Sequence, residues 1–439
     1  MDTQSENQMN PNTHAQVNPV DYSRPLIIPR IESLDLLRGI ALLGILLINI
    51  VSMGAPYAAL ENPTAHGTFS LADQIAWAGV FIFAQQKFIA IFAMLFGAGV
   101  ILLSRLNESK GLAPKPLHFK RMGWLALFGI FHAWFLWYGD ILLTYAVAGC
   151  FAWLWRNKAA VTLMVWGVFI YAVPALLYTA LHVSLANLDA ELLTTLASGW
   201  SPSQAEVAQE ITAVTGGLSA LWAERGALIL SLQTDSLLFG SLWLALGYML
   251  IGMALFKTGV LTAAASRRVY MLLALLVVPG TAISAYSAYF RYVDGFTLEN
   301  SMLMPLVWHQ AGSLLTAIGY IAIFMLCFQT GVLNWLQSRL KAVGRMAFSL
   351  YIMHSVLAVI LFNWIGLFGQ LQRFQLIMLA VAIWILQLWL APLYLARFRY
   401  GPLEYIWRWL TYGPKVLQRS ATAEQTTETG TSGRQDTDA

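Results

Sequence analysis

The sequence predicts an all-α, polytopic membrane protein with about ten transmembrane helices, both termini in the cytoplasm, one long outer loop and a C-terminal interfacial helix. Hydrophobic residues make up 58% of its 439 positions and charged residues only 11%. A soluble domain carries about 25% charged residues. Apolar stretches of about 20 residues, the length that crosses a bilayer core, recur along the chain.

Basic residues alternate between the gaps that separate the apolar stretches. Of the 26 Lys and Arg residues, 22 fall in every second gap or in the tails, whereas the intervening gaps hold Arg225, Arg291 and Arg373. Basic loops face the cytoplasm, so this pattern orients the whole chain. It also accounts for the pI of about 9.0 without a nucleic-acid partner.

The apolar stretches are interpreted as ten spans. They cover residues 36–54, 80–104, 120–138, 140–156, 159–183, 235–257, 268–291, 306–328, 345–366 and 374–397. The fourth span is short, so we expect it to stand upright or to thin the bilayer locally. Cys150 and Cys327 lie inside spans, which argues against a structural disulfide.

Residues 71–104 are too long for one straight crossing. A continuous helix would measure about 50 Å, against a bilayer core of about 30 Å. Two crossings would place the basic residues 105–121 outside and invert every later loop. We therefore expect one crossing with a break near Gln85 and Gln86, and residues 71–84 either re-enter or lie at the outer interface.

The remaining segments flank the spans. Residues 1–32 and 414–439 are polar and are predicted to be disordered tails around a transmembrane domain at 33–413; the first tail lacks the apolar core of a signal peptide. The outer loop at 184–234 contains Ser201-Pro202 followed by apolar residues with the spacing of an N-capped amphipathic helix, namely Val207, Ile211, Val214 and Leu218. Residues 401–413 predict an interfacial helix with Pro402 near its start and Leu403, Ile406, Trp407 and Leu410 on one face.

Lys87 is the one cation placed inside a span. It lies near the bilayer midplane, where a charge costs about 2.5–3.5 kcal/mol. Its side chain either reaches the interface or an internal carboxylate, or it faces a polar cavity and holds an anionic ligand.

The first span carries polar residues at both ends. Asp35 and Arg38 lie one turn apart at the cytoplasmic end, as a juxtamembrane pair or as part of a binding site. Asn49 follows roughly 16 Å further along the axis, in the outer half. A buried Asn either bridges helices or contacts substrate.

Histidines and carboxylates gather toward the predicted outer face. A neutral imidazole at His66 would take a proton from a hydroxyl or amine if a carboxylate such as Asp73 oriented it. His132, Asp140 and His309 also lie on the outer side.

His354 lies nearer the cytoplasm, either as a packing residue or as part of a site. No metal-ligand spacing occurs, so no metal is expected. The absence of a G-x-S-x-G elbow disfavours serine hydrolysis.

Five stretches resemble the YeiB-like family of bacterial inner-membrane proteins, which is defined by a domain of unknown function. They are SLDLLRGIALLGILLIN at 33–49, KFIAIFAMLFGAGV at 87–100, FGIFHAWFLWYGDILLTYAVAG at 128–149, VGRMAFSLYIMHSV at 343–356 and GPLEYIWRWLTYG at 401–413. The resemblance covers most of residues 33–413 and implies a multi-pass protein of the bacterial inner membrane.

A more distant resemblance concerns activity. Asp-x-x-Arg-Gly, then Asn49, His66 and Asp73, is similar to the transmembrane acyltransferases typified by heparan-alpha-glucosaminide N-acetyltransferase. That resemblance implies Asn49 and His66 as the catalytic pair, with acetyl-CoA reached from the cytoplasm and the acceptor outside. The G-R-x-x-x-S-x-Y-x-x-H stretch ending at His354 is similar to a late-span motif of broader membrane acyltransferases.

The first functional hypothesis is therefore acyl transfer from cytoplasmic acyl-CoA, as cosubstrate, to an envelope glycan or lipid acceptor. His66 would be the base, Asn49 would hold the reacting oxygen, and Asp73 or Asp140 would support the imidazole. The basic groups Arg38, Lys120, Arg121 and Arg345 would form a cytoplasmic mouth for the polyanion, and Lys87 would line the channel. The alternatives are a transporter or flippase, in which Lys87 forms a substrate path or proton relay, and a membrane assembly factor that docks partners on 184–234.

Overall fold

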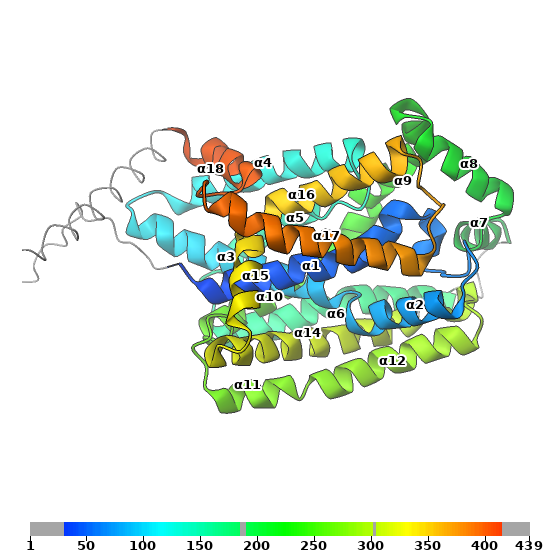
Figure 1. Ribbon diagram of the computed structural model, residues 1–439. Coiled ribbons are helices and arrows are strands. Elements are labelled where there is room, and N and C mark those ends of the chain that lie inside the picture. Colours follow the sequence, from blue (N-terminus) through cyan, green and yellow to red (C-terminus); the bar gives the residue numbers. More distant parts are fainter. Residues whose placement is uncertain (1–29, 185–189, 302–303, 415–439) are drawn as a thin grey trace, which may run out of the picture.

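The computed structural model describes residues 30–184, 190–301 and 304–414, and the described part is built from helices and their connections. Most of the long helices run roughly side by side and form one elongated bundle (Figure 1). The predicted tails at 1–32 and 414–439 lie almost entirely outside the described residues and stay predictions.

The helices follow one another along the chain with short connections. They are α1 Glu32–Gly54, η1 Tyr57–Leu60, α2 Leu71–Phe83, α3 Lys87–Ser109, α4 Pro114–Phe135, α5 Leu142–Trp155, α6 Ala160–Ser184, α7 Ala190–Trp200, α8 Gln204–Thr215, α9 Leu218–Gln233, η3 Leu237–Ser241, α10 Leu242–Lys257, α11 Arg267–Ala274, α12 Val277–Val293, α13 Leu298–Ser301, α14 Met304–Thr330, α15 Asn334–Arg345, α16 Ala347–Ala358, η4 Val359–Trp364, α17 Arg373–Leu395 and α18 Pro402–Tyr412.

The predicted fold class is confirmed. Within the described residues, eight helical segments are long and apolar enough to cross a membrane. Helices α4 and α5 occupy the predicted third and fourth spans, and α5 has only 14 residues, about 21 Å of helix. The total of ten crossings and the cytoplasmic placement of both termini stay predictions.

The predicted break in residues 71–104 is confirmed. Helix α2 ends at Phe83, Gln86 has a left-handed φ of 64°, and α3 restarts at Lys87. Near the start of α2, Asp73 contacts Phe374 at the start of α17. Near the end of α3, Asn107 contacts Tyr412 in α18, which follows the end of α17. The two halves therefore cross the bundle once.

The long outer loop of the prediction folds as three helices, α7 to α9 (Figure 1). The amphipathic helix α8 is present, but its N-cap is Ser203, whose hydroxyl accepts from the backbone of Glu206 while the Glu206 carboxylate accepts from Ser203. Val207 and Val214 are buried as the pattern indicates. Leu218 begins α9 instead of continuing α8, because Gly216 and Gly217 end that helix.

The predicted C-terminal helix is confirmed as α18, with Pro402 as its first residue. Trp407 is buried against the bundle, whereas Tyr405, Ile406 and Trp409 are exposed. Ile406 therefore does not share the buried face of Trp407. Exposed aromatic side chains on such a helix suit a membrane interface.

The bundle has two chemically different ends. We call the loop end the end that carries residues 55–70, residues 365–372 and helices α8 and α9. We call the basic end the opposite one, which carries Arg38, Arg121, Arg345 and α18. In Figure 1 the loop end lies to the right and α18 to the left.

Candidate functional site

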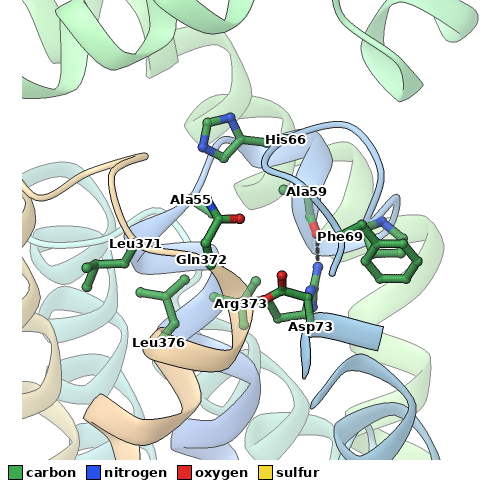
Figure 2. A pocket seen from close by; sticks show the side chains of 11 residues that line it. Ala55, Ala59, His66, Phe69, Asp73, Leu371, Gln372, Arg373 and Leu376 are labelled. Carbon is green, nitrogen blue, oxygen red and sulfur yellow. Dashed lines mark hydrogen bonds between the residues drawn. The ribbon is translucent and has the colours of Figure 1, made fainter. Parts of the chain in front are cut away.

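A small cavity at the loop end contains two of the predicted catalytic residues. It is lined by Val51, Ala55, Ala59, Pro63, His66, Phe69, Asp73, Leu371, Gln372, Arg373 and Leu376, and has a volume of about 20 Å³. That is room for about one water molecule. Figure 2 shows its lining drawn from the first loop, α2 and the start of α17. The cavity admits a group the size of a hydroxyl or an amine.

His66 is held by a backbone carbonyl. Its Nε2 lies 2.8 Å from the oxygen of Gly369, and a carbonyl oxygen only accepts, so Nε2 donates. In the neutral ring, Nδ1 is then the accepting nitrogen. Gly369 itself has a φ of 70° and donates its N–H to Gly54 at the end of α1. The ring is therefore fixed against α1 through the turn before α17.

Asp73 does not orient His66, which corrects the expected pairing. One carboxylate oxygen accepts from the N–H and the hydroxyl of Ser70, the N-cap of α2, and the other accepts from the Phe374 N–H at 2.9 Å. Asp73 thus satisfies free N–H groups at the starts of α2 and α17, where a negative charge is favoured. In Figure 2 its carboxylate and the His66 ring lie apart.

Arginines from three distant helices hold the loop of residues 55–70, directly or through Glu210. Arg373 donates to the carbonyl of Ala59, the contact drawn in Figure 2. Arg291 donates to the carbonyl of Glu61 and lies 3.6 Å from its carboxylate. Arg225 pairs with Glu210 at 2.6 Å, and Glu210 accepts from the backbone N–H of Tyr57.

These arginines were missed as site residues, although a signal was present. All three oppose the positive-inside rule, which predicts few cations on the outer side. A cation in a disfavoured place needs a compensating partner, and each of the three has one in the structure.

Asn49 and Asp140 do not line this cavity, so it provides neither the expected contact of Asn49 with the reacting oxygen nor the expected support of the His66 ring by Asp140. Asn49 is half-buried in α1, and its backbone carbonyl accepts from Ser52. Asp140 instead pairs with His132, at 2.9 Å from its Nδ1. The helical phase of α1 turns Asn49 away from the residues that line the cavity.

The basic end brings together Arg38, Arg121 and Arg345, which were predicted to bind the donor. Arg38 donates to Asp35 at 3.0 Å, and Arg30 pairs with the other oxygen of that carboxylate. Arg121 lies within electrostatic reach of Arg38 and stacks 3.4 Å above the Trp407 ring. Arg345 interacts with the charge of Asp35. Arg399 and Arg408 add further positive charge around these side chains.

Two glycines allow α1 and α15 to approach closely at the basic end. Helices α1 and α15 cross so closely that a Cβ added at Gly39 would lie 2.0 Å from the Leu340 oxygen, and one at Gly344 would lie 1.8 Å from the Asp35 oxygen. The Asp-x-x-Arg-Gly and Gly-Arg stretches thus meet backbone to backbone. This contact sets Arg38 and Arg345 beside the same carboxylate.

Lys87 lies away from the basic end, which corrects its grouping with the donor-binding arginines. Its ammonium is fully buried and donates to the Phe81 carbonyl at 3.0 Å and to the Ser284 hydroxyl at 3.1 Å. The break between α2 and α3 leaves that carbonyl without its usual helical partner. Lys87 therefore closes the break; the described contacts show neither the expected carboxylate partner nor a cavity.

The other two candidate histidines are also buried. His309 lies with its Nε2 3.5 Å from the Lys87 ammonium and its ring against Phe81. His354 accepts from the Gln387 amide at 2.6 Å, which links α16 to α17. The described contacts of His354 are those of a packing residue, whereas His309 extends the polar contacts of Lys87.

Comparison with known proteins places the chain among bacterial relatives. Residues 255–414 match the family described as "Protein of unknown function (DUF418)". The Escherichia coli (strain K12) "Uncharacterized protein YeiB" is 30% identical over 401 residues, which cover 88% of this chain and 98% of that protein. The Bacillus subtilis (strain 168) "Uncharacterized protein YxaH" is 28% identical over 402 residues, 87% of this chain and 94% of that protein.

No solved structure matches the chain significantly. The identity to YeiB extends over almost the full length of both chains, so it reaches the loop end and the basic end alike. The predicted resemblance is therefore confirmed: the chain belongs to the YeiB-like family of proteins and carries that family's DUF418 segment in its C-terminal part.

Proposed function

We propose that this protein is a membrane acyltransferase that moves an acyl group from acyl-CoA, bound at the basic end, to a hydroxyl or amine at the loop end. The observation that carries the proposal is the fixed tautomer of His66. Because Nε2–H donates a hydrogen bond to the Gly369 carbonyl, Nδ1 is the nitrogen that can accept a proton from an acceptor group. The relatives named above are bacterial, and we propose a bacterial inner membrane as the location and an envelope glycan or lipid as the acceptor.

The cavity fits the acceptor's reacting group. Its volume of about 20 Å³ holds a hydroxyl or an amine but no thioester arm. In the transfer, the acceptor oxygen or nitrogen attacks the carbonyl of the acyl group and His66 takes its proton, while the C–S bond of the donor breaks and the coenzyme leaves as a thiolate. The hydrogen bond from Arg373 to the Ala59 carbonyl would hold the loop of residues 55–70, and with it the His66 ring, in place during this step.

The basic end suits the donor's phosphates. Arg38, Arg121 and Arg345 lie together with more positive than negative charge around them. The Nε of Arg345 and of Arg408 are buried donors without an acceptor among the described residues. Phosphate oxygens are acceptors that guanidinium groups bind strongly.

The test combines binding and turnover on the full chain in detergent. Native mass spectrometry should find coenzyme A or acyl-CoA bound, and Arg345→Gln should weaken that binding at least about tenfold. Labelled acetyl-CoA supplied with an envelope extract should give labelled acceptor, and His66→Ala should lower that rate by about 10²–10⁴-fold.

His118→Ala is the matched control, because His118 Nε2 also contacts a carbonyl, that of Gly149 at 3.1 Å, away from the cavity. A His66→Ala protein with undiminished transfer, or a protein that binds no coenzyme, would refute the proposal.

Transport is the second candidate, favoured by one observation. Lys87, Ser284 and His309 form a buried polar chain inside the bundle. Polar chains of this kind relay protons in transporters. Proton-coupled uptake into vesicles that Lys87→Met abolishes, together with no labelled acceptor in the transfer assay, would favour transport over transfer.

A further inference from the structure

Three polar side chains form a hydrogen-bonded series between α4, the α4–α5 connection and α16. His132 Nδ1 lies 2.9 Å from Asp140, and His132 Nε2 lies 2.8 Å from the hydroxyl of Ser355. The second oxygen of Asp140 accepts from the Leu143 N–H at the start of α5. The distances match those of the Ser–His–Asp arrangement in enzymes with a nucleophilic serine.

The direction of each hydrogen bond is fixed by chemistry. A carboxylate only accepts, so Nδ1 of His132 donates to Asp140, and the neutral ring then accepts the Ser355 hydroxyl proton at Nε2. This is the direction in which a histidine removes a proton from an attacking serine. The sequence motif for such a serine is absent, but triads are defined by geometry and occur on unrelated folds.

The surroundings of the series are apolar. Ser355 is 0% exposed, His132 1%, and the Asp140 side chain 4%. Buried polar groups cost free energy unless they are paired, and a low local dielectric strengthens each pair. The helix containing Ser355 changes to a π-helix at Val359, a deviation that is frequent at functional sites.

One buried apolar cluster extends from the series to the cavity that holds His66. It includes Val51, Ala55 and Leu376, which line the cavity, and also Ala133 and Ala358, which lie beside His132 and one turn after Ser355. An acyl chain on Ser355 would therefore enter apolar surroundings continuous with the acceptor cavity.

We propose that Ser355 is a nucleophile that takes the acyl group from the thioester donor before the acceptor receives it. The proposal rests on the proposed function for the identity of the donor. The Ser355 oxygen attacks the thioester carbonyl, its proton passes to His132 Nε2, the C–S bond breaks and the coenzyme leaves as a thiolate. The products are an ester on Ser355 and an imidazolium that Asp140 stabilises.

The second half restores the serine. The acceptor oxygen attacks the ester carbonyl and its proton passes to His66. The bond from the carbonyl carbon to Ser355 breaks, and the serine oxygen takes back the proton held by His132. Water at the loop end takes the proton from His66, and water at the basic end protonates the thiolate, so that atoms and charges balance.

The experiment detects the ester directly on the full-length protein. The protein is treated with isotope-labelled acetyl-CoA without acceptor, or with a small alkyl fluorophosphonate, and the modified peptide is identified by mass spectrometry. Both reagents should modify Ser355 in the wild type. Ser355→Ala should lose the adduct, and His132→Gln should slow its formation by about 10²–10⁴-fold.

Control variants separate chemistry from folding. Ser52→Ala removes another buried, hydrogen-bonded serine hydroxyl in the same half of the bundle and should leave labelling of Ser355 unchanged. Ser355→Cys keeps a nucleophile and should itself be modified by labelled acetyl-CoA. His66→Ala should still form the acetyl ester but fail to pass it on.

Each outcome decides one of the two proposals. A fluorophosphonate adduct on Ser355 without an acetyl adduct would support the nucleophile and refute the donor. Acceptor labelling that continues at full rate in Ser355→Ala would refute the nucleophile and keep the proposed function. No adduct from either reagent would refute the nucleophile as well.

Discussion

At the scale of single residues, the partner of a histidine determines what its ring can do. His66 donates from Nε2 to a backbone carbonyl and is one of the residues that line a small cavity. His132 lies between the Asp140 carboxylate and the Ser355 hydroxyl, an arrangement in which the ring could accept a proton from the serine. His354 is bonded to an amide and joins two helices. Three residues of one type thus carry three different roles.

Asp73 should matter for stability more than for proton transfer. It caps α2 and accepts from the first turn of α17, so Asp73→Ala leaves N–H groups of two helices without an acceptor. We expect a loss of about 1–3 kcal/mol in the free energy of unfolding, measured by thermal unfolding in detergent.

Glu206→Ala is the matched control, because Glu206 makes the same capping box with Ser203 at the exposed start of α8. It should cost less than Asp73→Ala. Equal losses for the two variants would show that the contact with α17 contributes nothing.

Glu404 should give the protein a pH-dependent stability. Burial raises the pKa of this carboxyl above its ordinary value of 4.5, although it accepts from Ser349 and from the Phe348 N–H. The folded state then binds the proton more tightly than the unfolded state. Its contribution to stability is therefore present below about pH 4.5 and is lost as the pH rises through the raised pKa.

Glu404→Gln keeps the shape and removes the titration. As the pH is raised from 4 to 7, the melting temperature of the wild type should fall relative to that of Glu404→Gln. A difference that stays constant over this range would contradict the predicted shift.

At the scale of helices, the crossing of α1 and α15 assembles the basic end. Glycine at positions 39 and 344 lets the two backbones touch. The neighbouring residues Arg38 and Arg345 then both interact with the negative charge of Asp35. The close approach requires glycine on both helices, because a Cβ at either position would overlap a carbonyl oxygen.

Gly39→Ala should therefore disturb both stability and donor binding. Overpacking of this kind costs about 1–3 kcal/mol or more, because the blocking atom belongs to the backbone and cannot move aside. The melting temperature should fall and the affinity for the coenzyme should decrease. Gly99→Ala in α3 is the control, since no described atom lies within 4 Å of the added Cβ there. Matching behaviour of the two variants would disprove the role of the crossing.

At the scale of the whole molecule, the two ends of the bundle carry separate groups of paired arginines. At the basic end Arg30 and Arg38 pair with Asp35, whereas at the loop end Arg225 pairs with Glu210 and Arg291 pairs with Glu61. The broken α2–α3 segment crosses the bundle once between them. A donor bound at one end and an acceptor held at the other would place an acyl transfer across the membrane.

The orientation of the bundle can be tested by thiol labelling in cells. Thr68 is exposed at the loop end and Ser109 is exposed at the end of α3. Each is replaced by cysteine, one at a time, in a chain whose Cys150 and Cys327 have been replaced. A membrane-impermeant thiol reagent should label Thr68→Cys in intact cells and Ser109→Cys only after permeabilisation. The reverse pattern would invert the map and remove the proposed direction of transfer.

The sequence by itself determined the fold class, the apolar stretches that form long helices, and the break near Gln86. These follow from local quantities: the length of apolar stretches, the thickness of a bilayer and the placement of charges. It also indicated His66 and the cluster of basic residues.

Only the tertiary structure decided which polar groups meet. Asp73 contacts α17 instead of His66, Asp140 contacts His132, and Ser355 joins them although no local motif marks it. The physical reason is one of scale. A hydrogen bond needs atoms within about 3 Å, whereas a shift of one residue turns a helical side chain by about 100°. Packing between distant helices sets that rotation, and it cannot be deduced from the local pattern of a single sequence.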